Sequence, residues 1–277
     1  MPIISWSHSR LGVFESCARR AFLQFEAKIP EPERPLPLGK TEHANDRGTR
    51  IHEGCEGFVR YAKPLPTEAG KYFRAEFDAL KNLYEQGRVS LEGEWGMNQA
   101  WEPCGWNGDW VEIDDVKTIK SRKYPPVRPA PSELWRTKQR TFIWTPAWLR
   151  LKLDAIVHVS AHEAIAIDFK SGRKFGNELK HAEQLQLYQL VAFLRYPMLE
   201  TITTELWYLD QDELTSATFT RAQGLRFQRN WDMRGNKVTS AIDFPPNSNH
   251  FSCRYCAYGL PEHGFENGTG HCTAGRK

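Results

Sequence analysis

The sequence predicts an α/β protein in which helices alternate with short paired strands. Apolar and polar residues alternate over Leu151–Val159 and again over Glu163–Lys170, and this period of two is typical of strands. Asn177–Arg195 carries apolar residues at helical spacing instead and stops before Pro197. The chain has 277 residues, ample for a buried core, and we expect one domain over residues 1–277.

The N-terminal part is predicted to be mainly helical. Its polar, proline-rich stretch Ile29–Leu38 is typical of a loop, and Val89–Trp95 is typical of a strand. Thr67 is an expected N-cap and Gly87 an expected helix stop. Helices are expected over Ser9–Phe25, Asn45–Tyr61 and Thr67–Gln86.

The remaining segments complete the predicted order. Residues 100–146 are rich in Trp, Pro and basic residues, which indicates an insertion. A second hairpin is expected from Thr203–Leu209 and Leu214–Thr220, followed by a helix over Arg221–Trp231. The tail over residues 245–277 is loop-like and contains three cysteines.

The hairpin at Leu151–Lys170 brings acidic residues together. Only Ser160–His162 separate the strands, so a turn centred there places Asp154 directly across from Asp168. Opposed side chains in an antiparallel pair have Cβ atoms roughly 5 Å apart. Two carboxylates at that distance repel unless a proton or a divalent cation lies between them. With Lys170 two residues on, this pattern predicts a metal site beside a lysine.

Charge and hydropathy exclude few functions. The net charge is only +3, but Lys117 to Lys152 contains ten Lys or Arg against one acid, Glu133. No apolar run approaches the roughly 20 residues that cross a bilayer, and the first residues are not a secretory signal. We therefore expect a cytoplasmic protein without a membrane partner.

Three motifs in order resemble the RecB-like branch of the PD-(D/E)XK nuclease superfamily. Asp154 followed by Asp168–Lys170 resembles the nuclease core motif. Arg47–Glu53, which contains His52, resembles the branch's G-t-x-x-H helix motif, and Gln184–Tyr188 resembles its Q-x-x-x-Y motif. The resemblance implies a restriction-endonuclease-like fold, with a mixed central sheet flanked by helices.

The same resemblance implies a metal-dependent deoxyribonuclease, specifically an exonuclease acting on single-stranded DNA ends. A non-catalytic nucleic-acid-binding or assembly subunit with this fold is the alternative. Lys170 would orient the attacking water or neutralise developing charge, while Gln184 and Tyr188 would orient Lys170 or contact DNA. The implied ligands of Mg²⁺ or Mn²⁺ are His52, Asp154, Asp168 and the carbonyl of Phe169.

Other interpretations of these residues stay open at this point. His52 is compatible with a helix surface, and the two aspartates with a solvated sheet face shared with Lys152 and Lys170. Glu94 is a weaker candidate ligand, and it shares its predicted strand face with Glu92.

Four of the six cysteines resemble the iron–sulfur arrangement of AddB-type nucleases and CRISPR-associated RecB-like exonucleases. The resemblance implies a [4Fe–4S] cluster that joins the first helix to the tail. Fifteen residues separate the last two cysteines, more than is usual in those families, and zinc or free thiols remain alternatives. Cys55 and Cys104 are expected to be ordinary thiols. The implied cluster ligands are Cys17, Cys253, Cys256 and Cys272.

The basic, tryptophan-rich segment suggests contact with single-stranded nucleic acid, because phosphates bind Lys and Arg and unpaired bases stack on aromatic rings. For any one tryptophan, a place in the core is the alternative. Its tryptophans are Trp95, Trp101, Trp106, Trp110, Trp135, Trp144 and Trp148. The candidate DNA contacts are Lys117, Lys120, Arg122, Lys123, Arg136, Lys138 and Arg140.

Overall fold

A mixed six-stranded sheet forms the centre of the protein. The structure is a computed structural model that describes residues 3–36, 38–113, 134–136, 141–172, 174–261 and 268–274. The strand order is β2-β1-β6-β7-β8-β9, and every pair is antiparallel except β7 with β8. The strands are β1 (Val89–Met97), β2 (Pro103–Cys104), β6 (Leu149–His158), β7 (Glu163–Lys170), β8 (Thr201–Tyr208) and β9 (Glu213–Thr220).

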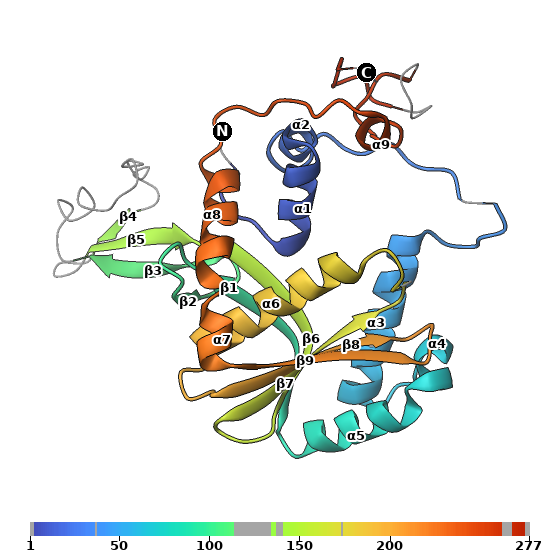
Figure 1. Cartoon of the computed structure of the whole chain (residues 1–277), viewed down its shortest axis with the longest axis vertical. Helices are drawn as coiled ribbons and strands as arrows, with labels where there is room; N and C mark the ends of the chain where they lie inside the picture. Colours follow the sequence, from blue (N-terminus) through green and yellow to red (C-terminus); the bar gives the residue numbers. More distant parts are fainter. Residues whose placement is uncertain are drawn as a thin grey trace.

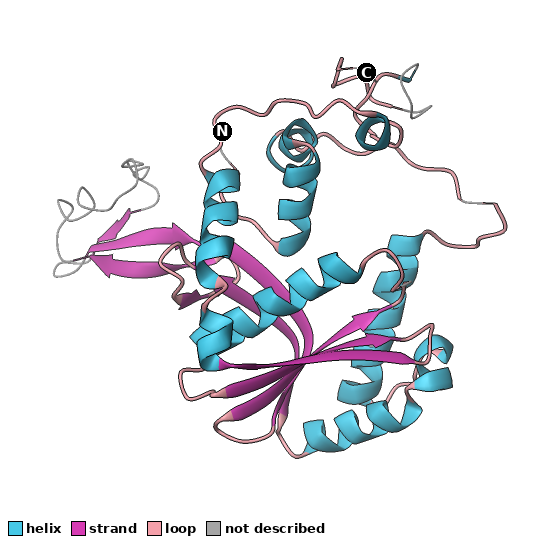
Figure 2. Cartoon of the chain, in the orientation of Figure 1, coloured by secondary structure: helices cyan, strands magenta, loops and turns pink. Residues whose placement is uncertain are grey.

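Helices cover both faces of this sheet, which confirms the predicted mixed α/β fold (Figures 1 and 2). On one face lie α1 (His8–Ser16), α6 (Glu178–Arg195), α7 (Arg221–Leu225) and α8 (Gln228–Thr239). On the other lie α3 (Ala44–Tyr61), α4 (Thr67–Tyr72) and α5 (Arg74–Glu85). The remaining helices are α2 (Ala18–Ala21), the π-helix η1 (Phe22–Glu26) and α9 (His250–Cys253).

A second, three-stranded sheet extends from the side of the body (Figure 1). It has the antiparallel order β3-β5-β4 and comprises β3 (Gly108–Ile113), β4 (Leu134–Arg136) and β5 (Thr141–Pro146). It belongs to the segment that the composition marked as an insertion.

Both predicted hairpins are confirmed. In the first, Ala155 pairs with Ile167 and Ile156 with Ala166, the register that a turn around Ala161 requires. The parallel pairing of β7 with β8 needs a crossover, and α6 supplies it. This β7–α6–β8 unit brings the end of β7 and the first turns of α6 to one edge of the sheet.

Three helices predicted as continuous are interrupted. Cys17, with φ −160° and ψ 109°, separates α1 from α2, and Phe73 separates α4 from α5. The predicted Arg221–Trp231 helix is likewise split between α7 and α8. Thr67 begins α4 rather than capping it, because Pro66 occupies the N-cap. At Phe73 tertiary packing outweighs helix periodicity, since the ring is buried and stacks on Trp207.

Two hydrophobic clusters fill the two sides of the sheet. The first packs around Leu153, Leu190 and Trp231, and the second packs around Ile51, Phe77 and Trp207. Strands β1 and β6 contribute to both clusters.

The strict alternation predicted for β6 is wrong at Asp154. Leu151 and Leu153 belong to the first cluster, but Ala155 belongs to the second, so the side chains change face. The neighbouring β1 changes face at the same level, between Leu91 and Trp95. There Glu92 has a left-handed backbone with φ 50°, which a period-two pattern does not encode.

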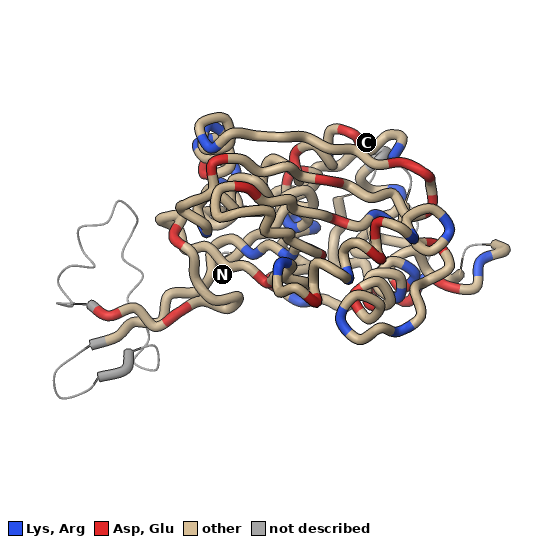
Figure 3. The backbone as a smooth tube through the Cα atoms, turned by 90° about the horizontal axis from the view of Figure 1, so that it is seen from below, with Lys and Arg blue, Asp and Glu red and all other residues tan. Residues whose placement is uncertain are grey.

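Charged residues of both signs are interspersed over the body of the protein (Figure 3). The backbone view therefore marks no face as basic or acidic. No helix in the part of the chain that the structure describes is long and apolar enough to cross a membrane.

Candidate active site

A cavity of about 650 Å³ opens where β6 and β7 stop pairing. The ladder between them ends at Ala155 and Ile167. Beyond that point the Phe169 amide donates to Asp154 Oδ2 at 2.6 Å rather than to a backbone carbonyl of β6. A side-chain acceptor thus replaces a ladder bond, and the side chains of Asp154 and Asp168 line the same cavity.

Asp168 is surrounded by the residues that the sequence motifs selected. Tyr188 donates from its hydroxyl to Asp168 Oδ1 at 2.6 Å, and the Gln184 amide donates to the same oxygen at 3.2 Å. Lys170 Nζ lies 2.6 Å from Asp168 Oδ2 and donates to Gln184 Oε1 at 2.8 Å. Gln184 and Tyr188 lie one turn apart on α6, so both face the site.

Burial and mutual repulsion set the electrostatics of the acids. Asp154 and Asp168 are 8% and 5% exposed, which excludes the solvated sheet face. Burial, reinforced by the charge of Asp168, raises the pKa of Asp154 despite its hydrogen bonds. Burial opposes ionisation of His52, but its 2.8 Å hydrogen bond to Asp154 Oδ1 and the charges of Asp154 and Asp168 together outweigh burial and raise the pKa of His52. His52 is therefore a partner of Asp154 rather than a free surface histidine.

Helix α3 is held against the end of β7 by contacts that sequence reasoning missed. Arg47 donates to the Ser171 carbonyl at 2.8 Å and binds both oxygens of Asp210, at 2.6 and 2.9 Å. Gly48 permits this close approach, because a Cβ at that position would lie 3.3 Å from Ser171 Oγ. No sequence signal linked Arg47 to Asp210, since 163 positions separate them.

Further acids line the cavity. Glu92 lines it and forms an ion pair with Lys152, whereas Glu94, on the same strand, is exposed and not part of the lining. The left-handed backbone at Glu92 separates the faces of these two residues, which the sequence placed together. Glu53 and Glu56 of α3 also line the cavity. Glu56 lies four residues after His52, so helical spacing could have predicted that both side chains face the cavity.

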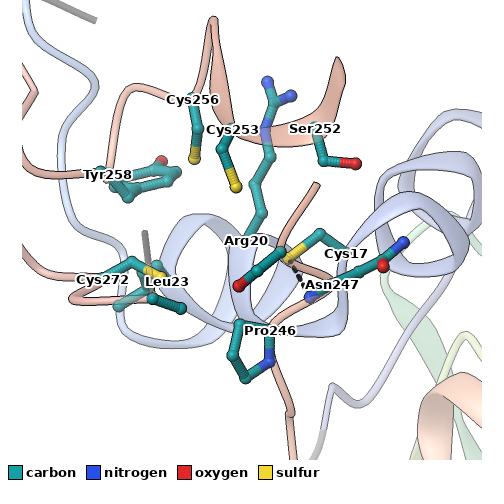
Figure 4. A pocket seen from close by; sticks show the side chains of 13 residues that line it. Cys17, Arg20, Leu23, Pro246, Asn247, Ser252, Cys253, Cys256, Tyr258 and Cys272 are labelled. Atoms are coloured by element: carbon teal, nitrogen blue, oxygen red, sulfur yellow. Dashed lines mark hydrogen bonds between the residues drawn. The ribbon is translucent and has the colours of Figure 1, made fainter. Parts of the chain in front are cut away.

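The four cysteines singled out from the sequence line one pocket (Figure 4). The extended backbone at Cys17 turns its side chain toward Cys253, Cys256 and Cys272 of the tail. Cys17 Sγ accepts a hydrogen bond from the backbone N–H of Asn247 at 3.4 Å. Burial raises the pKa of Cys256, opposed by a backbone hydrogen bond and Arg20, and the nearby Cys17 and Cys272 add to the rise.

The tail returns to this pocket through backbone hydrogen bonds. Thr269 donates to the Ala257 carbonyl at 2.9 Å, and Cys272 donates to the Tyr258 carbonyl at 2.7 Å. These bonds carry Cys272 back to the C-x-x-C pair despite the long spacing. Cys55 and Cys104 lie elsewhere; burial raises the pKa of Cys104 to about 11 and that of Cys55 further.

The tryptophans of the basic, tryptophan-rich segment differ in their exposure. Trp95, Trp101 and Trp148 are buried in the first hydrophobic cluster, so they are core residues. Trp106, Trp110 and Trp144 remain at least partly exposed. Arg136 lies in β4. Six candidate DNA contacts lie outside the described residues: Lys117, Lys120, Arg122, Lys123, Lys138 and Arg140.

Comparison with known proteins identifies the family of the chain. The family model of the PD-(D/E)XK nuclease superfamily matches residues 5–259. The chain belongs to the PD-(D/E)XK nuclease superfamily. No curated protein matches the chain. Ten chains of solved structures match, among them "Crystal structure of SSO0001", which is 15% identical over 91% of this chain and 82% of that one, with a TM-score of 0.36.

The residues that the sequence motifs selected meet in one cavity. Asp154, Asp168 and Lys170 line it, together with His52 of α3. Such an arrangement can bind a cation and a phosphate side by side, because carboxylates and an ammonium group meet there.

Proposed function

We propose that this nuclease hydrolyses phosphodiester bonds in DNA with Mg²⁺ or Mn²⁺, acting as an exonuclease on single-stranded ends. One observation supports this most strongly: two buried carboxylates, Asp154 and Asp168, share a cavity with Lys170. Buried like charges are unfavourable unless a cation or proton compensates them. The order of the sequence motifs supports assignment to the RecB-like branch.

The residues present fit a hard divalent cation. Asp168 Oδ2 and Glu92 Oε2 are buried carboxylate oxygens, and each is ion-paired with a lysine, Lys170 and Lys152 respectively. Within the described ranges, no group of three or more His, Cys, Asp or Glu side chains could hold a metal ion by itself. Mg²⁺ retains several waters and needs only one or two carboxylates, which Asp154 and Asp168 supply. The Phe169 carbonyl would add a backbone ligand, and His52 would join the ligands on release of its hydrogen bond to Asp154 Oδ1.

The bound metal would polarise the scissile phosphate and lower the pKa of a bound water. Lys170, held between Asp168 and Gln184, would place its ammonium group beside the phosphate oxygen that gains charge. Tyr188 would keep Asp168 in one orientation through its short hydrogen bond. These side chains come from β7 and α6, so the elements themselves pre-organise the site.

The pocket that the four cysteines line is proposed to hold a [4Fe–4S] cluster. A single zinc ion has thiolates about 2.3 Å from the metal, so its ligands must converge on one point. All four cysteines line one pocket, and four thiolates are the ligand set of a [4Fe–4S] cluster; the metal analysis below distinguishes it from zinc. The cluster would join the segment at Cys17 to the tail and so restrict the unfolded chain strongly.

Cleavage of end-labelled DNA with Mg²⁺ or Mn²⁺ tests the proposed nuclease activity. Asp154→Ala and Lys170→Ala should abolish cleavage, whereas the surface control Lys237→Ala should retain it. Equal activity in all variants would refute this active site. Binding without cleavage by the wild type, under both metals, would instead favour the non-catalytic subunit.

Metal analysis of anaerobically purified protein tests the cysteine site. The wild type should be brown and contain iron and acid-labile sulfide, and Cys17→Ala should lose both. Cys104→Ala is the matched control, because Cys104 lies outside the pocket. Stoichiometric zinc, or a Cys17→Ala variant with unchanged colour, would contradict the proposed [4Fe–4S] cluster.

A further inference from the structure

A second cavity, of about 410 Å³, lies against the first. Lys152, Lys170 and Gln184 line both cavities, so the two are adjacent. The second cavity extends from these residues along β6 and α6 to the first turn of α1 and to Trp106. A strand whose scissile phosphate lies at Lys170 has this space directly beside it.

The two cavities have opposite charge. The first is lined by Glu53, Glu56, Glu92, Asp154 and Asp168, whereas the described lining of the second contains no acid. The cations that line the second are Arg150, Lys152, Lys170 and Lys180.

Two of these cations lack compensation. Lys152 is paired with Glu92 and Lys170 with Asp168, but Arg150 and Lys180 form no ion pair with any residue that the structure describes. Arg150 Nε is buried and has no hydrogen-bond partner there. An uncompensated, partly desolvated guanidinium favours binding of an anion.

Two histidines that line the cavity respond to the same charges. Burial lowers the pKa of His8 to about 4, and Lys180 and Lys170 contribute to the fall against the opposing charge of Glu183. Burial, then Lys170 and Lys180, also lower the pKa of His181, opposed by Asp168 and Glu178. Both imidazoles are therefore neutral near pH 7, and the cavity is cationic through its lysines and arginine.

Trp106 adds an aromatic surface to this cationic wall. Its ring is half-buried and lines the cavity, and the Arg150 guanidinium lies over it at 5.6 Å. An indole beside phosphate-binding cations can stack on an unpaired base. The buried Trp95, Trp101 and Trp148 cannot do so, which leaves Trp106 as the tryptophan of this wall.

We propose that this second cavity binds the nucleotides of a single strand adjacent to the scissile phosphodiester, with Arg150 and Lys180 contacting phosphates and Trp106 stacking on a base. This inference rests on the proposed nuclease function and assigns its substrate groove. A volume of this size is that of a small-molecule site of about 300–1,000 Å³, which suits nucleotides of one strand. The bases of a duplex are paired and already stacked, so they gain nothing from Trp106.

The charge part of this proposal is tested by binding without added divalent metal. Fluorescence anisotropy of a labelled oligodeoxythymidylate gives the affinity of the full chain at several salt concentrations. Each lost phosphate contact should reduce the slope of log affinity against log salt by about 0.7 for a single strand. Arg150→Gln/Lys180→Gln should therefore lower the slope by about 1.4, whereas Arg229→Gln, on an exposed part of α8, should leave it unchanged.

The stacking part makes a different prediction. Trp106→Ala should weaken single-strand binding about tenfold at every salt concentration, without changing the slope. Trp106→Phe should restore much of the affinity, and a blunt duplex should bind equally to wild type and Trp106→Ala. Trp110→Ala is the matched control, because this partly exposed tryptophan lies on β3 outside the cavity.

The outcomes separate this groove from the nuclease itself. If cleavage depends on Lys170 but the cavity variants keep the wild-type slopes and affinities, the proposed binding groove is wrong and the nuclease function stands. If binding shows the predicted dependences but no cleavage occurs, the nuclease function is wrong and the binding groove stands. Thermal melting checks folding; if Arg150→Gln destabilises the chain, the exposed Lys180→Gln alone should still lower the slope by about 0.7.

Discussion

Replacing Tyr188 with phenylalanine removes one hydroxyl from the centre of the site. That hydroxyl is buried and donates to Asp168 Oδ1 at 2.6 Å, so its loss leaves a buried carboxylate under-bonded. A hydrogen bond to a charged group contributes about 1.5–3 kcal/mol. The Gln184 amide, at 3.2 Å from the same oxygen, remains as a weaker donor. We therefore expect Tyr188→Phe to lower the free energy of unfolding by about 2 kcal/mol.

Urea denaturation followed by circular dichroism measures this loss, and Tm should fall by about 4–8 °C. Tyr208→Phe is the matched control, because the Tyr208 hydroxyl lies 2.7 Å from His181 Nδ1 and that imidazole is neutral. A neutral hydrogen bond contributes about 1 kcal/mol, so the control should lose about half as much. A Tyr188→Phe loss equal to that of the control, or below about 0.5 kcal/mol, would refute a charge-assisted bond at Asp168.

Three further expectations follow from the structure. Mn²⁺ at about one hundred times its Kd should stabilise the wild type by about 2.7 kcal/mol in thermal melts, and Asp154→Asn should abolish that response. The pKa of His8 is about 4 when folded against 6.5 ordinarily, so unfolding binds a proton between these values. Stability should rise by about 3 kcal/mol as pH increases across that window, and His8→Gln should flatten the urea-midpoint profile. Arg47→Gln should speed hydrogen exchange at the Leu209 amide, which donates to Lys170 beside this contact, whereas Arg74→Gln, which breaks an exposed ion pair, should leave it unchanged.

Local patterns predicted the parts of the fold that depend on local chemistry. The short turn fixed the register of β6 with β7, and the spacing of Gln184 and Tyr188 placed both on one helical face. The family resemblance then linked these elements to His52, more than one hundred positions from Asp154. Local periodicity alone contained no signal for that contact.

The features that sequence missed arise from tertiary packing. At Glu92 of β1 and Asp154 of β6, the side chains switch from one face of the sheet to the other at the same level. The sequence of each strand alone predicts regular alternation, so it does not predict this paired switch. The break at Phe73 comes from stacking on Trp207, far along the chain. The burial of Trp101, whose indole donates to Asp232 at 3.2 Å, depended on where the insertion packs.

The bend at Glu92 and Asp154 has a consequence for cooperativity. Because β1 and β6 each run from one hydrophobic cluster into the other, neither cluster can lose its strands while the other stays intact. Calorimetry of the body of the protein should therefore show a single transition whose van't Hoff and calorimetric enthalpies agree. A large-to-small substitution on either side, at Phe77 or at Leu190, should lower the same transition temperature. Glu92 and Asp154 lie where β1 and β6 pass from one cluster to the other, so the positions of these acids depend on both clusters.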